Sequence, residues 1–349
     1  MVMELIHGGD VYSYAAAHGG AMPLDLSANI NPFGIPPRVS QAMHHAIAHC
    51  ERYPDPLCRA LRRAIGEAQQ VDEDWIFCGN GAAEVLFRLS AVIHPQCALL
   101  TAPTFAEYEQ SLSGCELRFH LLRENEGFAL TERFLDALTP DLDAVYLCNP
   151  NNPTGRTIDP ALLREIVARC KQNGTWLIVD ECFLDFLQEE ERHTLRTVLP
   201  DYDRLVLLRA FTKMYAVPGV RLGYCMSANT TLIDALYRVG QPWNVSVIAQ
   251  ACGVAATRER EFVRQTAVAI ARERDALTGA LRARGLNVYP AQANFVLLHT
   301  RDRLFGQKLA QKGILVRDCS NYRGLSPGYY RIAVRDESAR HRLLAALDD

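Results

Sequence analysis

Residues 175–181 read TWLIVDE, an apolar run that ends in two acidic residues. A short apolar run of this kind is typical of a strand buried inside a parallel sheet. Asp180 then stands at the carboxyl end of the strand, which is where open α/β sheets hold their ligands. An Asp after a strand is more often a cap or turn residue, so its meaning depends on the segments around it.

Similar apolar runs alternate with segments of helical periodicity through residues 74–226. The runs are DWIFC (74–78), CALLT (97–101), DAVYLC (143–148), RLVLLR (204–209) and RLGYCM (221–226). This alternation predicts a largely parallel α/β sheet. Two helices are expected before it, and residues 247–284 favour one long helix or a broken pair.

The chain changes character after residue 284 and divides into three parts. Strands are expected at NFVLLHT (294–300), ILVR (314–317) and YYRIAV (329–334), beside helices at 302–312 and 337–347. This pattern predicts a smaller α+β unit packed onto the main sheet. The expected division is an N-terminal arm that contributes to the active site and the small domain (1–45), a large domain (46–250), and a linking helix with a small C-terminal domain (251–349).

Composition excludes several classes of protein. Lys and Arg total 37 against 40 Asp and Glu, so the chain has no broad positive field for nucleic acid. The 11 cysteines are odd in number and contain no C-x-x-C pair, so neither a disulfide framework nor a metal site is expected. The first residues lack the pattern of a signal peptide, and no run approaches the ~18 apolar residues of a membrane span. We expect a soluble cytosolic protein that binds no membrane.

Three further motifs carry groups with chemical potential. Asn152 stands in NPNNPTG, which alone is a polar turn. Gly81 ends GNG, between a predicted strand and a predicted helix, where backbone N–H groups can hold a phosphate. Lys213 lies in RAFTKMYAVPGVRLGY, in an expected loop between two strands, and Arg221 follows eight residues later. Together with Asp180 these motifs provide an amine, a carboxylate and a phosphate cup, the set that pyridoxal 5′-phosphate requires.

In this order the motifs resemble the fold-type I pyridoxal-phosphate enzymes of the class I/II aminotransferase group. The resemblance implies that Lys213 forms the Schiff base with the cofactor, that Asp180 pairs with its ring nitrogen and that Asn152 donates to its ring hydroxyl. The residues implied around the cofactor phosphate and ring are Gly81, Ala82, Thr212, Arg221 and Phe105. Phe183 and Ala210 depart from the Tyr and the Ser or Thr that many members have at these positions.

Tyr53 in ERYPDP is similar to the group's tyrosine that reaches the cofactor phosphate of the neighbouring subunit. The resemblance therefore implies a homodimer with shared active sites. A Tyr before Pro is more commonly a packed turn residue.

The segments HGGD (7–10), DLSANINPFG (25–34) and VRDCSNYRGLSPGYYRIAVR (316–335) resemble one branch of this group, the L-threonine O-3-phosphate decarboxylases of cobalamin biosynthesis. The branch implies pyridoxal-phosphate-dependent decarboxylation to (R)-1-amino-2-propanol O-2-phosphate. It also implies that Arg331 binds the substrate carboxylate. The candidates for holding the substrate phosphate are His7, Asn31, Arg317 and Arg323, and a solvated surface role is the alternative for each.

Two other functions remain open. One is an aminotransferase close to the histidinol-phosphate enzymes, which share the R-Y-P-D and N-P-T-G elements. The other is a non-catalytic domain that senses the cofactor, which the presence of Lys213 and Asp180 disfavours. The sequence also leaves open whether phosphothreonine, phosphoserine or a related compound is the substrate, and which group returns a proton to Cα.

Overall fold

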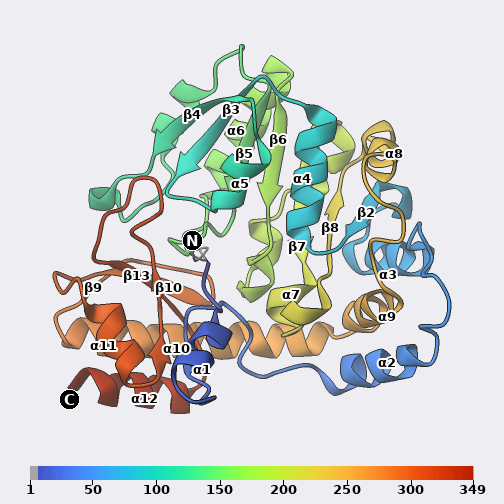
Figure 1. The fold of residues 1–349 in the computed structure, drawn as a ribbon. Helices are drawn as coiled ribbons and strands as arrows, with labels where there is room; N and C mark the ends of the chain where they lie inside the picture. The colour runs from blue at the N-terminus through green and yellow to red at the C-terminus, as the bar shows by residue number, and fades with distance from the viewer. Residues whose placement is uncertain (1–6, 349) are drawn as a thin grey trace.

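The computed structural model describes residues 7–348, and its largest element is a seven-stranded sheet (Figure 1). The strand order is β2-β8-β7-β6-β5-β3-β4, in which β8 is antiparallel to both neighbours and the other pairs are parallel. The strands are β2 (Ile76–Gly79), β3 (Cys97–Ala102), β4 (Glu116–Leu121), β5 (Ala144–Cys148), β6 (Trp176–Asp180), β7 (Leu205–Ala210) and β8 (Gly223–Met226).

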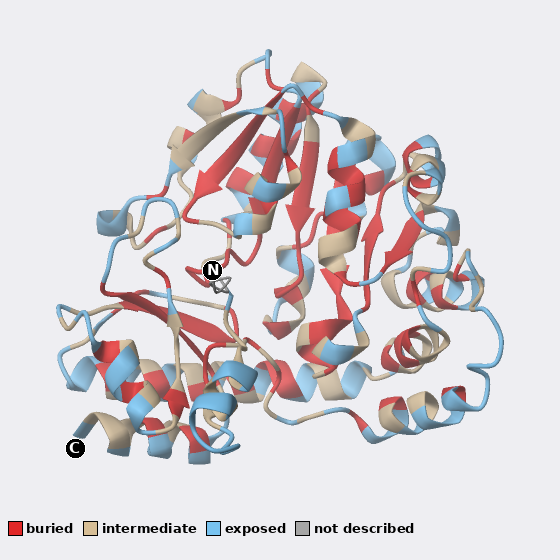
Figure 2. Cartoon of the chain, viewed as in Figure 1, coloured by how far each residue is buried: buried red, intermediate tan, exposed pale blue. Residues whose placement is uncertain are grey.

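Helices cover both faces of this sheet, and its inner strands are buried apart from the half-buried Trp176 that begins β6 (Figure 2). Successive strand residues point to opposite faces, so Leu177 and Val179 of β6 join one apolar cluster while Ile178 joins the other. The helices of this unit are α4 (Ala82–Ile93), α5 (Ala106–Ser111), α6 (Pro160–Asn173), α7 (Phe211–Met214) and α8 (Thr230–Arg238). Helix α6 has clear local signals: Asp159 caps its first turn and Gly174 ends it in a left-handed conformation.

The C-terminal part forms a second, antiparallel sheet of order β12-β13-β10-β9, and the N-terminal arm adds a short parallel pair beside it. Its strands are β9 (Asn287–Val288), β10 (Phe295–His299), β12 (Arg317–Asp318) and β13 (Tyr329–Ala333), and β1 (Leu24–Asp25) pairs with β11 (Ile314–Leu315). The surrounding helices are α1 (Val11–Ala17), α11 (Phe305–Gln311) and α12 (Glu337–Asp348). The ILVR run is thus split between two sheets, whereas we expected one strand.

Four helices connect the two parts: α2 (Pro37–Ile47), α3 (Arg59–Gln69), α9 (Val247–Ala256) and α10 (Arg260–Ala283). Helix α10 runs below both sheets in Figure 1, and α2 packs against α9. The expected domain limits at 45/46 and 250/251 fall inside α2 and α9. We therefore propose that the division of the chain lies outside these two helices.

Most expected elements are confirmed, with informative exceptions. Residues 247–284 form the broken pair of helices, and Lys213 lies in the one-turn helix α7 where we expected a loop. Strand β4 was missed because ELRFHL is a partly exposed edge strand in which charged and apolar residues are mixed. Among residues 7–348, no helix has the length and apolar character needed to cross a membrane.

Candidate active site

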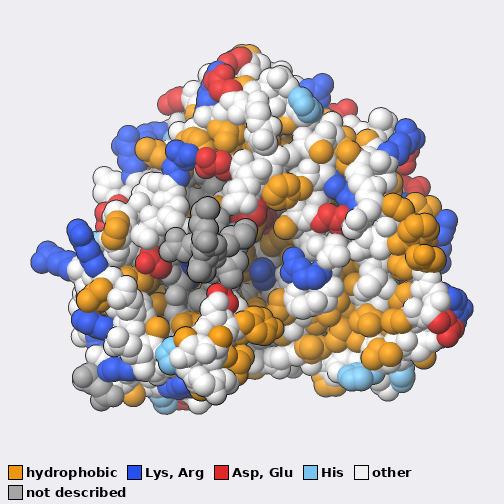
Figure 3. Space-filling view, in the orientation of Figure 1, with side chains coloured by type: hydrophobic (Ala, Val, Ile, Leu, Met, Phe, Trp, Pro, Cys, Tyr) orange, Lys and Arg blue, Asp and Glu red, His pale blue; other side chains and the backbone are white. Residues whose placement is uncertain are grey.

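A cavity of about 110 Å³ lies at the carboxyl ends of β5, β6 and β7, next to the start of α4. This is the edge at which a parallel sheet leaves room for a ligand between its loops. The space-filling view shows the molecule hollowed between its two parts, with Lys and Arg side chains at the hollow (Figure 3). The predicted cofactor residues that line the cavity are Ala82, Phe105, Asn152, Asp180, Thr212, Lys213 and Arg221.

Lys213 is the amine of this cavity. Burial lowers the pKa of its ammonium group below the ordinary value, and the charges of Arg331 and Arg221 lower it further. Its Nζ lies 5.8 Å from the centre of the Phe183 ring, and its backbone oxygen accepts from the N–H of Asn31 at 3.1 Å. A buried lysine with a lowered pKa has more of the neutral amine that attacks a carbonyl.

Asp180 presents its carboxylate from the end of β6. Its Oδ2 accepts a hydrogen bond of 2.7 Å from the hydroxyl of Tyr108, and its Oδ1 accepts one of 2.9 Å from the N–H of Cys182. Burial and the nearby Asp180 raise the pKa of Tyr108 well above its ordinary value, so the phenol stays a donor. Tyr108 was not among the predicted site residues, although it stands three residues after Phe105 in α5.

The turn between β2 and α4 forms an anion cup. Gly81 has a φ of +86°, and a Cβ at this position would lie 2.6 Å from Nη2 of Arg221. The absence of a side chain therefore lets the guanidinium of Arg221 lie against the first turn of α4. Free N–H groups at a helix start, together with an arginine, suit a phosphate group.

Amine, carboxylate and anion cup share one buried cavity, and the donor set fits pyridoxal phosphate. Phe105, at the start of α5, and Phe183 add aromatic walls. Asn152 adds a polar group at the same edge, and its Oδ1 accepts a 2.5 Å hydrogen bond from Arg331.

Arg331 connects this cavity to the N-terminal arm. It is buried in β13, and its Nη2 donates to the backbone oxygen of Ser27 at 2.7 Å. Its Nε is buried and has no hydrogen-bond partner within residues 7–348. Ser27 Oγ in turn accepts from the N–H of Gly9 at 2.7 Å. Arg331 is thus held rigidly beside Asn152, next to the side chains that line the cavity.

The four phosphate candidates lie in different surroundings. His7 Nε2 is 3.2 Å from Oε1 of Glu107, and Arg317 lies on β12 with its guanidinium over the ring of Tyr322. Asn31 is buried, and its Nδ2 donates to the backbone oxygen of Met214 at 2.6 Å, which connects the N-terminal arm to α7.

Arg323 does not line the cofactor cavity and instead lines a separate one beside β3 and β4. Its guanidinium pairs with Glu109 at 2.7 Å and lies 4.1 Å from the centre of the Phe119 ring. These contacts fix the loop that carries Arg323 against the edge of the sheet.

Tyr53 does not line the cavity of its own chain. Its side chain is 79% exposed, and its ring stacks on that of Trp243 with 4.7 Å between centres.

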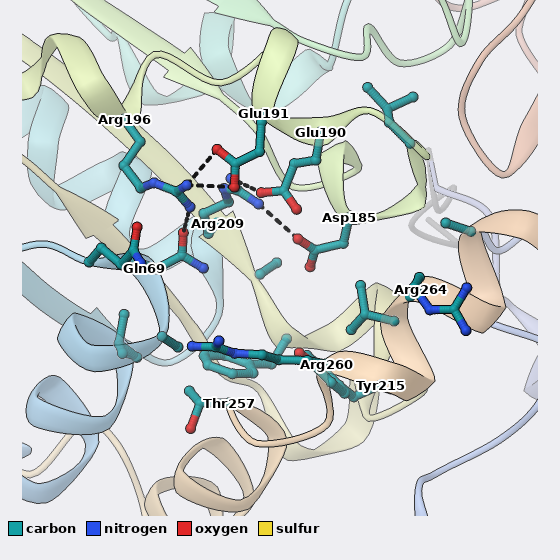
Figure 4. Close-up of a pocket in the computed structure, with 18 of the residues that line it drawn as sticks. Gln69, Asp185, Glu190, Glu191, Arg196, Arg209, Tyr215, Thr257, Arg260 and Arg264 are labelled. Carbon is teal, nitrogen blue, oxygen red and sulfur yellow. Dashed lines mark hydrogen bonds and ion pairs between the residues drawn. The ribbon is translucent and has the colours of Figure 1, made fainter.

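A larger cavity of about 440 Å³ lies near α3 and the start of α10 and holds a charged cluster (Figure 4). Arg209 of β7 is buried and pairs with Glu181 at 2.9 Å, Asp185 at 2.8 Å and Glu190 at 2.7 Å. Burial raises the pKa of Asp185 to about 7 despite the nearby Arg209. Because side chains alternate along β7, Arg209 points away from Leu208, which lines the cofactor cavity. This cluster therefore stabilises the strand from behind the site.

Comparisons with known proteins agree with this geometry. Residues 21–347 match the aminotransferase class I and II family. The threonine-phosphate decarboxylase of Salmonella typhimurium is 39% identical, with 98% of this chain and 95% of that protein covered. The histidinol-phosphate aminotransferase of Halalkalibacterium halodurans is 30% identical, with 93% and 88% covered. The crystal structure of the histidinol-phosphate aminotransferase from Clostridium acetobutylicum has a TM-score of 0.87 at 28% identity, with 93% and 98% covered.

The chain belongs to the class I and II aminotransferase family, whose fold is fold-type I and whose cofactor is pyridoxal phosphate. Within the family it is more similar to the Salmonella decarboxylase than to either histidinol-phosphate enzyme named above.

Proposed function

We propose that this protein is a pyridoxal-phosphate-dependent carboxy-lyase that converts L-threonine O-3-phosphate into (R)-1-amino-2-propanol O-2-phosphate and CO₂. The observation that carries the proposal is the 39% identity to a threonine-phosphate decarboxylase over nearly the whole chain. The cavity alone would also fit an aminotransferase, which is the second candidate and is represented by relatives of 30% identity or less. The product would supply the aminopropanol part of cobalamin.

Four residues would hold and tune the cofactor. Bound pyridoxal phosphate supplies an electron sink for the bond that breaks at Cα. Lys213 would hold it covalently through its amine. Asp180 would pair with the ring nitrogen, because the hydrogen bonds from Tyr108 and the Cys182 N–H hold its carboxylate in place at the end of β6. Asn152 would donate to the ring hydroxyl.

The cofactor phosphate and ring would be bound by the residues at the edge of the cavity. Arg221, Thr212 and the start of α4 at Gly81 and Ala82 would bind the phosphate, and Phe105 would stack on the ring.

Reaction type is set by substrate anchoring, since only the Cα bond perpendicular to the cofactor ring is weakened. Arg331 would bind the carboxylate, using the buried Nε that has no hydrogen-bond partner within residues 7–348. His7 and Arg317 would bind the phosphate at the other end of the molecule. Two anchored anionic ends would fix the orientation of the substrate. The carboxylate would leave as CO₂, and Lys213 would deliver the proton that replaces it at Cα.

The active site in this proposal is shared between two subunits. Tyr53 and Trp243 are exposed on the monomer, and further exposed apolar residues are Phe33, Ile35 and Ile47. Apolar side chains also gather on the face near α2 and α9 in Figure 3. A homodimer would bury this surface and bring Tyr53 to the partner's cofactor phosphate. We place the enzyme in the cytoplasm, because its 11 free cysteines suit a reducing compartment.

The decisive assay supplies phosphothreonine without a keto acid and measures CO₂. A parallel assay supplies histidinol phosphate with 2-oxoglutarate and measures glutamate. We expect CO₂ in the first assay and no glutamate in the second, and the opposite result would assign the chain to the aminotransferases.

Lys213→Ala is expected to abolish CO₂ release without unfolding the protein, because it removes a buried amine and no structural hydrogen bond of that amine is seen among residues 7–348. Circular dichroism and the melting temperature check the fold. Turnover at the wild-type rate would show that Lys213 is not the catalytic amine.

A further inference from the structure

A carboxylate lies among the groups that would bind the substrate, and the proposed function does not use it. Glu107 is the second residue of α5, and its side chain is only 13% exposed. Its Oε1 is 3.2 Å from Nε2 of His7. Its Oε2 is buried and has no hydrogen-bond partner in the described part of the chain.

Cationic groups from three separate elements act on this carboxylate. They are His7 of the N-terminal arm, Lys213 of α7 and Arg317 of β12. Burial raises the pKa of Glu107 above its ordinary value, and the three cations oppose that rise. The other acid of the same helix, Glu109, is engaged elsewhere, since it pairs with Arg323 at 2.7 Å.

We propose that Glu107 is the internal counter-ion of the substrate site. It balances the charge of the cations that bind the substrate phosphate, and the phosphate replaces it as their partner when the substrate binds. The inference rests on the proposed function, which gives His7 and Arg317 this role. A phosphate dianion and a buried carboxylate facing the same cations repel each other. Their repulsion is relieved when the carboxylate takes one proton from solvent and becomes a neutral acid, with no bond formed to the substrate.

Two consequences follow for binding. Phosphate esters bind with uptake of a proton by Glu107, and their affinity falls as the pH rises and the carboxyl group becomes harder to protonate. Glu107 is a positioning residue, because it acts on the substrate through His7 and Arg317.

Isopropyl phosphate is a suitable probe, since it carries a secondary phosphate ester but no amine that could react with the cofactor. We compare the wild-type holoenzyme with Glu107→Gln by calorimetry in buffers of different ionisation enthalpy. Glu109→Gln is the matched control, because it neutralises the neighbouring carboxylate of the same helix.

We expect Glu107→Gln to reduce the proton uptake and to tighten binding by about tenfold near pH 8, the effect of one nearby charge. The difference should shrink as the pH falls, and Glu109→Gln should have no such effect. Weaker binding after Glu107→Gln at every pH would indicate a structural role and overturn the proposal. Equal binding and proton uptake, or no binding of the probe by either variant or by the wild type, would also overturn it.

The proposed function is tested separately by CO₂ release from phosphothreonine in the wild-type enzyme. An enzyme that releases CO₂ but shows no Glu107-dependent proton uptake refutes only the counter-ion role. An enzyme that binds the probe as expected but releases no CO₂ refutes only the assigned reaction.

Discussion

The hydroxyl of Tyr108 donates to the carboxylate of Asp180, and removing this contact is a direct test of the cofactor site. Tyr108→Phe keeps the ring and removes one hydrogen bond to the carboxylate of Asp180. A hydrogen bond to a charged group contributes about 1.5–3 kcal/mol, so we expect a lower melting temperature, and kcat should fall by roughly ten- to a hundredfold as the carboxylate loses its fixed position.

Steady-state CO₂ release measures this effect, and Tyr146→Phe is its control. Tyr146 is also buried, but its hydroxyl contacts Ser90 at 3.2 Å and not Asp180. If both variants lost the same activity, the hydrogen bond to Asp180 would not be the cause.

The turn between β2 and α4 is the element whose shape the anion cup requires. Gly81→Ala adds a Cβ 2.6 Å from Arg221 Nη2, at a φ of +86° that alanine adopts at a cost. The guanidinium must move, so we expect weaker retention of pyridoxal phosphate during dialysis, measured by the absorbance of the bound cofactor. Gly114→Ala also has a positive φ of +84°, with open space around its Cβ, and serves as the control. Equal retention in the two variants would show that the turn between β2 and α4 does not bind the cofactor phosphate.

The charge cluster behind β7 makes the stability of this element depend on pH. The pKa of Asp185 is about 7 in the fold against an ordinary 3.8, so the folded state holds this proton more tightly than the unfolded chain. The stabilisation that protonated Asp185 gives to the folded state is complete below about pH 4 and is lost as the pH rises towards 7.

Asp185→Asn abolishes this dependence while keeping a side chain that can contact Arg209. We expect the melting temperature of the variant relative to the wild type to rise between about pH 4 and pH 7, which differential scanning fluorimetry measures. A difference that stays constant with pH would show that Asp185 is charged throughout.

At the scale of the whole molecule, the proposed sharing of sites can be tested by subunit complementation. In a heterodimer of Lys213→Ala and Tyr53→Phe chains, one site carries both changes and the other carries neither if Tyr53 acts across the interface. We therefore expect this heterodimer to regain about half of the wild-type activity per dimer at a limiting cofactor concentration. A Tyr53 that acts within its own chain would leave no intact site, and the heterodimer would lack this recovery.

Local patterns in the sequence were enough to predict the elements that carry the cofactor residues. The apolar run before Asp180, the glycine turn before Ala82 and the N-P-T-G turn at Asn152 depend on side-chain periodicity and turn chemistry, which act over a few residues. Seven of the predicted cofactor residues line one cavity, because these elements meet at one edge of the sheet. Edge strand β4 and the divided run at 314–317 escaped prediction, because pairing with distant strands decides them.

Which groups meet across long sequence separations depends on how the elements pack in three dimensions. The sequence determined a lysine, an aspartate and an arginine in an α/β sheet, and with them the class of cofactor. It did not determine that the Asn31 amide would donate to the backbone oxygen of Met214, that Arg323 would pair with Glu109, or that Glu107 would contact His7. These contacts arise from the packing of the arm and the C-terminal sheet on the large sheet. Residue type alone does not distinguish a cationic side chain that is held by a partner from one that is solvated at the surface.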